Sequence, residues 1–212
     1  MNVSKKGARR RDDGLKRRPP SRNARSRILV VCEGIVTERT YLNSLKHLAR
    51  NPLVQLEISK KHGVPKTVVE CAVVHQTKAA QDAKRERDSN LLYDEVWAVF
   101  DVDEHPHIDI ALDLAKRHDI SVALSSPSFE IGALLHFQTQ TRAEDRKKVR
   151  ALLKKHLPEY DKELNALDLE DGYPMAVRRA VALAKEAADE REVLRNPSTG
   201  MYLLAQRIRS GA

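Results

Sequence analysis

The sequence predicts an α/β fold, in which a parallel β-sheet is flanked by helices and followed by a C-terminal helical subdomain. Residues 28–33 and 96–101 are short apolar runs whose Val, Ile, Phe and Trp content is typical of buried strands. The apolar spacing of helices recurs between these runs. Because strands that alternate with helices form parallel sheets, these observations together favour an α/β core.

The first half of the core is expected to alternate strand and helix. After the strand at 28–33, residues 37–50 place Tyr and Leu side chains on one helical face. Residues 53–59 alternate apolar and polar side chains, which predicts a second strand. A long helix follows to about residue 87, and its beginning is predicted at Thr67, where the letters TVVE match a capping box.

The second half of the core repeats this alternation. After the strand at 96–101, residues 108–118 predict an amphipathic helix and residues 120–124 predict a short strand. The Ser-Ser-Pro-Ser segment at 125–128 has the chemistry of a turn that also caps a helix. Residues 129–137 are almost wholly apolar, so we expect this helix to be buried.

The chain is expected to divide into a disordered basic tail (1–26), an α/β core (27–138) and a helical extension packed on the core (139–212). The extension contains three predicted helices, at 141–158, 174–191 and 198–209. The first of them has a basic face. In the second, a stripe of small apolar residues would allow close packing, and it consists of Val177, Ala180, Val181, Ala184 and Ala188.

Composition is typical of a folded cytoplasmic protein. The 212 residues suffice for one domain with a core, and 41% of them are hydrophobic. No run of about 18 apolar residues predicts a membrane span, and the N-terminus lacks the apolar segment of a signal peptide. Cys32 and Cys71 make neither a disulfide framework nor a zinc motif, so we expect a reduced cytoplasmic protein without zinc.

The positive charge is concentrated at the N-terminus. The chain has a net charge of +8, and residues 1–27 alone carry eleven Lys or Arg and two acids, a net of +9, so the remainder sums to −1. Such an arm attracts polyanions, of which nucleic acid is the commonest, although it would serve equally as a solubilising extension. The basic residues proposed to contact nucleic acid are Arg9, Arg10, Arg11, Lys16, Arg17 and Arg18.

Acidic side chains follow two of the predicted strands. Glu33 ends the first strand, and Asp101 and Asp103 follow the run that contains Trp97. The carboxyl ends of parallel strands meet at one edge of a sheet, where open α/β sheets bind their ligands. Crowded carboxylates favour a hard divalent cation, Mg²⁺ or Mn²⁺, as their partner. The alternative is that Asp101 caps the next helix and Asp103 faces solvent.

Five further residues are candidates for supporting roles. Gly34 permits close backbone approach, and amides near Thr37 at a helix start suit a phosphate. Glu38 would act as a dipole partner or as a second acid near the site, and His105 as a proton donor or as an exposed loop residue. Glu130, in the first turn of its helix, fits either the helix dipole or the metal edge.

Three segments together resemble the RloB-like proteins, a bacterial family associated with restriction loci and abortive phage infection. These segments are ILVVCEGIVTERT at 28–40, VWAVFDVDEH at 96–105 and SSPSFEIGALLH at 125–136, with NPST at 196–199 near the end. The resemblance implies a Toprim-like, Rossmannoid core, in which Glu33, Asp101 and Asp103 match the acids that bind Mg²⁺. The chain departs from the family pattern at residues 131–133, where a bulky aromatic residue is more usual after Phe-Glu.

The function expected on these grounds is a Mg²⁺-dependent nuclease that cleaves phosphodiesters in bacterial phage defence. Metal ions supply a nucleophilic water, charge neutralisation and help for the leaving oxygen. Two alternatives are a non-catalytic module that binds nucleic acid or a nucleotide, and a Toprim-type nucleotidyl transferase. The basic helix at 141–158 would equally suit a partner protein of a defence locus. No Walker A, G-x-S-x-G or G-x-G-x-x-G motif favours another chemistry.

Removal of residues 1–26 should leave the fold intact and weaken nucleic-acid binding, because the tail has almost no large apolar side chains and most of the excess charge. The salt dependence of log K should become shallower, since fewer counterions are released. Fluorescence anisotropy with labelled DNA and RNA at several salt concentrations measures both effects. Equal salt dependence with and without the tail would show that the tail takes no part in binding.

Overall fold

The computed structural model describes residues 25–102 and 107–211. The basic tail contacts predicted within residues 1–24 lie outside this range, as do Asp103 and His105. A five-stranded sheet with the order β2-β1-β3-β4-β5 forms the centre of the molecule. The first four strands are parallel and β5 is antiparallel to β4, which confirms an α/β fold compatible with the Rossmann type. The strands are β1 (Ser26–Cys32), β2 (Val54–Ile58), β3 (Glu95–Asp101), β4 (Ser121–Ser126) and β5 (Ser198–Thr199).

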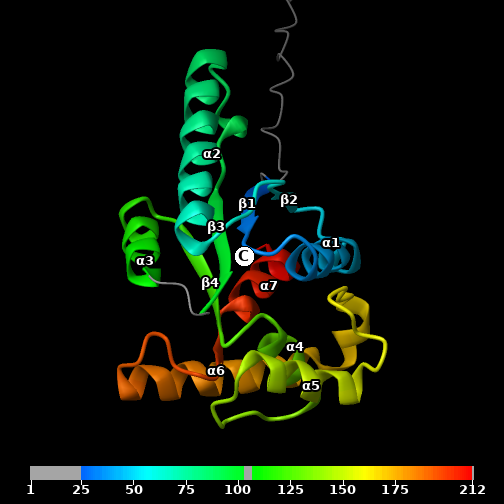
Figure 1. Cartoon of the computed structure of the whole chain (residues 1–212). Coiled ribbons are helices and arrows are strands. Elements are labelled where there is room, and N and C mark those ends of the chain that lie inside the picture. Colours follow the sequence, from blue (N-terminus) through cyan, green and yellow to red (C-terminus); the bar gives the residue numbers. More distant parts are fainter. Residues whose placement is uncertain (1–24, 103–106, 212) are drawn as a thin grey trace, which may run out of the picture.

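Helices cover both faces of the sheet and its carboxyl edge (Figure 1). In Figure 1, α2 and α3 lie on one side of the strands, α1 and α7 lie on the other, and α4, α5 and α6 gather beyond the ends of the strands. None of the described helices is long and apolar enough to cross a bilayer. The helices are α1 (Thr37–Ala49), α2 (Pro65–Glu86), α3 (Ile108–Arg117), α4 (Glu130–Phe137), α5 (Arg146–His156), α6 (Tyr173–Glu190) and α7 (Met201–Ser210), with short 3₁₀ turns η1 (Ser89–Leu91) and η2 (Ala166–Gly172).

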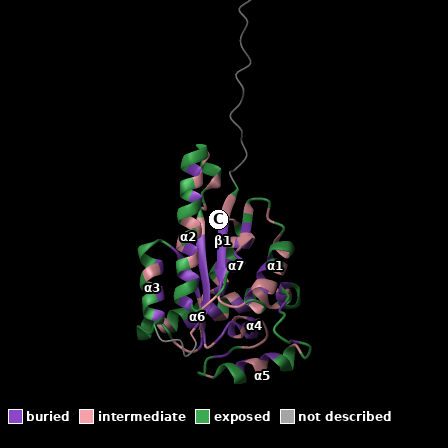
Figure 2. Ribbon diagram, turned by 45° about the horizontal axis from the view of Figure 1, so that its top comes forward, coloured by how far each residue is buried: buried purple, intermediate pink, exposed green. Residues whose placement is uncertain are grey.

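The central position of β1 explains its continuous apolar sequence. β1 pairs with β2 on one side and with β3 on the other, and every residue from Ile28 to Cys32 is fully buried. Successive side chains of a strand point to opposite faces, so both faces of β1 must be apolar when helices cover both. Figure 2 shows most of this strand as buried, among helices whose outer faces are exposed.

Two apolar clusters lie on the two faces of the sheet. Ile28 and Val30 point to the cluster that α1 and α7 complete, whereas Leu29 and Val31 point to the cluster that α2 and α3 complete. The first cluster also contains buried side chains from the C-terminal part of the chain, namely Leu153, Tyr160, Leu164, Leu169 and Leu204. Residues beyond 138 therefore form part of the same core that the strands build.

Some local expectations were wrong at the ends of helices. The α2 helix begins at Pro65, which suits the first turn because its φ is fixed, and no side chain caps that end. The Thr67 capping box is therefore absent. Residues 198–199 are strand β5 rather than the start of a helix, because their backbone pairs with β4. The α4 helix also lacks a side-chain cap, since Phe129 occupies its N-cap position.

The predicted stripe on α6 matches the face that this helix buries only at Ala180. Its buried residues are Ala176, Ala180 and Leu183, and they pack near Leu135 of α4. Val181, which the stripe includes, is 47% exposed. Both faces of α6 have small apolar residues, so only the position of α4 determines which face is covered.

The predicted burial of α4 is confirmed, and it allows the cost of shortening one of its buried side chains to be predicted. Leu135 is 1% exposed, so Leu135→Ala should lower the free energy of unfolding by about 2–5 kcal/mol through lost burial and a cavity. Leu203→Ala on α7 is the matched control, because Leu203 is 43% exposed and should cost far less. Urea denaturation of the three proteins measures the difference. Equal midpoints for the two variants would contradict the buried position of α4.

Candidate functional site

Two adjacent parallel strands bring Glu33 and Asp101 together at the carboxyl edge of the sheet. The N–H group of Glu33 donates to the Val99 carbonyl at 2.9 Å, which continues the β1–β3 ladder by one residue. The N–H group of Asp101 in turn donates to Oε2 of Glu33 at 3.1 Å. The convergence expected from the two strand ends is therefore present for this pair. The third predicted acid, Asp103, lies outside the described residues.

Glu38 joins this pair from the first turn of α1. Its side chain is 5% exposed, and its Oε1 accepts a hydrogen bond of 3.1 Å from the Gly34 N–H. A Cβ atom on residue 34 would lie 2.0 Å from Oε2 of Glu38. The lack of a side chain at Gly34 thus makes room for the Glu38 carboxylate, whereas the sequence suggested that it makes room for a ligand.

Tyr160, which sequence reasoning did not identify, links two of the predicted residues. Its hydroxyl donates to Oε1 of Glu130 at 2.9 Å and also forms a hydrogen bond with the Thr37 side chain. Burial and the Glu130 charge raise the pKa of Tyr160, so it stays protonated and serves as a donor. Glu130 and Thr37 therefore belong to one hydrogen-bonded group at this edge.

The acids are close enough to perturb one another. Burial raises the pKa of Asp101 well above its ordinary value, and the charges of Glu38, Glu33 and Glu130 raise it further. A backbone hydrogen bond from Phe129 opposes this rise in the pKa. Burial also raises the pKa of Glu38, and hydrogen bonds to backbone groups partly oppose that shift. The four carboxyl groups thus form a cluster whose full ionisation is unfavourable.

A basic helix from the C-terminal part of the chain contacts this acidic cluster. The Nη2 atom of Arg146, in the first turn of α5, lies 3.8 Å from Oδ2 of Asp101. One turn later, Arg150 pairs with Asp161 at 2.8 Å, and its guanidinium lies over the Tyr160 ring. The basic face of this helix was visible in the sequence, but its contact with Asp101 was not.

The donor chemistry of the cluster suits a hard divalent cation. Carboxylate oxygens are the ligands that Mg²⁺ and Mn²⁺ prefer, and a bound cation would offset the charges of Glu38, Glu33 and Glu130 that, after burial, raise the pKa of Asp101. Ser128 precedes Phe129, whose backbone binds Asp101, and its fully buried hydroxyl has no hydrogen-bond partner in the described part of the chain. Glu33 and Asp101 would be the ligands, although within residues 25–102 and 107–211 no three acids, His or Cys residues form a metal-binding group.

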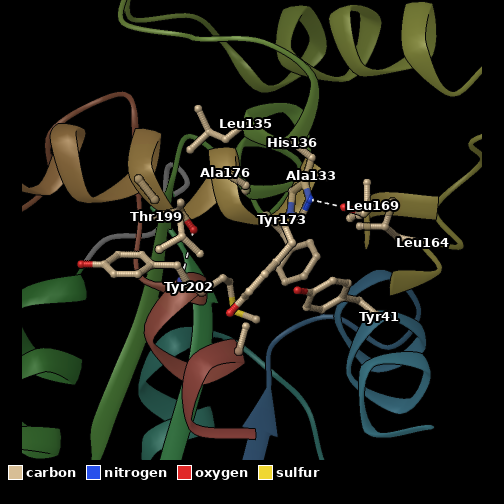
Figure 3. Close-up of a pocket in the computed structure, with 16 residues that line it drawn as sticks. Tyr41, Ala133, Leu135, His136, Leu164, Leu169, Tyr173, Ala176, Thr199 and Tyr202 are labelled. Atoms are coloured by element: carbon tan, nitrogen blue, oxygen red, sulfur yellow. Dashed lines mark hydrogen bonds between the residues drawn. The ribbon is translucent and has the colours of Figure 1, made fainter. Parts of the chain in front are cut away.

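A separate cavity lies under the site, between α4, α6 and α7 (Figure 3). Its volume is about 30 Å³, enough for about one water molecule. The ring of His136 lies beside it, and its Nδ1–H donates to the Leu169 carbonyl at 2.6 Å (Figure 3). Burial lowers the pKa of His136 to about 4, although this hydrogen bond opposes the shift. His136 is therefore neutral near pH 7, so it places no positive charge in the last turn of α4.

The lowered pKa of His136 predicts a loss of stability in acid. Below pH 6.5 the unfolded chain binds a proton at this residue and the folded chain does not until about pH 4, so stability falls as the pH drops through this window. His136→Asn keeps a donor near Leu169 and cannot titrate. Between pH 7 and pH 4.5 this variant should lose about 2–3 kcal/mol less than the wild type in urea denaturation.

The exposed His118 at the end of α3 provides the control for that comparison. His118→Asn should follow the wild type at both pH values. If His136→Asn also lost as much stability as the wild type, the buried neutral state of His136 would be refuted.

Comparison with known proteins gives one match. No curated protein and no solved structure matches the chain. The family model described as RloB-like protein matches residues 28–208, which include both strands that provide the acids and the helix that carries Arg146. This match covers most of the sequence, and the chain therefore belongs to the RloB-like protein family.

Proposed function

We propose that this protein is a Mg²⁺-dependent nuclease that cleaves phosphodiester bonds and acts in bacterial defence against phage. The observation that carries the proposal is the meeting of Glu33 and Asp101 at the carboxyl edge of a parallel sheet, with Arg146 beside them. That edge is where open α/β sheets bind their ligands. The role in defence is inferred from membership of the RloB-like family alone.

Some residues of the site would bind the cation and others would bind the phosphate. Glu33 and Asp101 would hold the Mg²⁺ ion, which when bound supplies charge neutralisation and an activated water. Arg146 extends from α5 next to Asp101 and is half exposed, and its guanidinium would contact a phosphoryl oxygen bound at this edge. Tyr160 holds Glu130 in place by donating to it, which keeps this carboxylate beside the ligands. Glu33 remains a candidate for general base as well as for ligand.

A binding module without catalysis is the second candidate. Within the described residues no three metal-binding side chains are grouped, and a binding module does not need such a group. In that case the acids would hold a cation or repel small anions, while basic residues retain nucleic acid. Nucleotidyl transfer is a third possibility that resemblance to Toprim proteins suggests.

Incubation of the purified protein with labelled DNA and RNA separates these candidates. The reactions contain Mg²⁺, Mn²⁺ or EDTA, and gel electrophoresis resolves the products. Cleavage in the presence of either metal and none in EDTA supports the nuclease. Retention of substrate without cleavage supports the binding module, and extension of a labelled strand with added nucleotides would indicate a transferase.

Asp101→Asn tests the metal site directly. In EDTA this variant should melt at or above the temperature of the wild type, because it removes a buried charge from among other acids. Mg²⁺ at a hundredfold excess over Kd should stabilise the wild type by about 2.7 kcal/mol and the variant by little. Cleavage should fall by orders of magnitude. Differential scanning calorimetry and the cleavage assay measure these effects.

Asp113→Asn is the matched control, because Asp113 is exposed on α3 and pairs only with the nearby Arg117 among the described residues. It should respond to Mg²⁺ as the wild type does. Stabilisation of Asp101→Asn by Mg²⁺ to the full extent of the wild type would eliminate the proposed metal site.

A further inference from the structure

A basic loop borders the acidic cluster on the β2 side. β2 runs parallel to β1, Ile58 pairs with Val30, and the Ser59 N–H donates to the Val30 carbonyl. The exposed Lys60 and Lys61 follow directly. Neighbouring strands lie about 4.8 Å apart, so the loop after β2 is next to the loop that carries Glu33.

The main chain of this loop is anchored while its side chains stay exposed. The Nη2 atom of Arg39, on α1, donates to the carbonyls of Lys60 at 2.8 Å and Lys61 at 3.0 Å. The main chain therefore fixes where these two lysines start, and no carboxylate among the described residues pairs with either of them.

The β3 side of the acidic cluster is also basic. The first turn of α5 brings Arg146 to within 3.8 Å of Asp101, and Lys147 and Lys148 on the same turn are exposed. The helix is fixed to the core through Val149 and Leu153, both fully buried. The acids thus lie between two anchored groups of positive charge.

The loop between these groups is apolar at its tip. Ile35 is 57% exposed and Val36 is 39% exposed, directly after the Glu33-Gly34 pair. Inorganic phosphate or a charged peptide has no apolar face to pack against these side chains. A nucleotide does, because its base lies next to its own phosphate. The combination favours a nucleotide polymer over a simple anion.

We propose that a single polynucleotide strand crosses the carboxyl edge of the sheet from the Lys60–Lys61 loop to the first turn of α5, and passes over the acidic cluster midway. Phosphates on either side would pair with the two basic groups, and the phosphate between them would face the acids and any cation they hold. The assignment of the acids rests on the proposed nuclease function, but the strand path rests on the two basic groups and on the exposed Ile35 and Val36.

Paired substitutions in the full-length protein test each half of the path. Lys60→Gln with Lys61→Gln removes the loop charges, and Lys147→Gln with Lys148→Gln removes those of α5. Lys84→Gln with Arg87→Gln is the control, because these exposed residues at the C-terminal end of α2 also lose two charges but lie towards the start of β3, away from the carboxyl edge. Anisotropy with labelled single-stranded DNA and RNA is measured in EDTA, so that no cleavage occurs.

Each test pair should reduce the slope of log K against log salt by roughly 1.4, because two phosphate contacts on a single strand are lost, and the control pair should not. A closed single-stranded circle should compete as well as a linear strand of equal length, since the path is open at both ends. Inorganic phosphate and mononucleotides should compete poorly. The separate DNA and RNA titrations identify which polymer is preferred.

Several outcomes would overturn the path. The first is a slope of log K against log salt that changes no more for either test pair than for the control pair. The second is a closed single-stranded circle that fails to compete, and the third is full competition by a mononucleotide. Slope losses in both test pairs without any cleavage in Mg²⁺ would preserve the path and reject the nuclease. Cleavage in Mg²⁺, with both test pairs showing the salt slope of the control pair, would support the nuclease and reject the strand path.

Discussion

The burial of Asp101 among other carboxyl groups is the constraint that organises the carboxyl edge of this protein. Burial and the charges of Glu38, Glu33 and Glu130 all disfavour its ionised form. The fold offsets this with a backbone hydrogen bond from Phe129 and with Arg146 on α5. The start of α4, the position of α5 and the geometry of the β1–β3 pair all meet at this carboxylate.

The C-terminal part of the chain contributes to this edge because it completes the core beneath it. Leu153 and Leu164 are buried in the same cluster as Ile28, and the Tyr160 hydroxyl binds Glu130. A helix anchored in this way holds its basic residues at a fixed place relative to the acids. The extension therefore determines what can approach the acids as well as contributing to stability.

Net charge alone describes this protein poorly. Beyond the N-terminal tail the charges nearly cancel, yet in the fold they are sorted: acids gather at the ends of β1 and β3, and exposed lysines lie on either side. Exposed charges interact over about 10 Å at ordinary salt concentrations, so sorting at this scale produces distinct local potentials. A polyanion with several phosphates can respond to such a pattern, whereas a single small anion next to the acids is repelled.

The sequence by itself determined the four parallel strands, most of the helices and the meeting of Glu33 with Asp101, because each depends on local periodicity and on the rule that parallel strands end at one edge. Other features were decided only by tertiary structure. Tyr160 binds Glu130 from 30 residues away, and the buried face of α6 depends on α4. His136 is neutral because of what surrounds it. Local sequence carries no record of such contacts, since burial and electrostatic environment arise only when distant segments pack together.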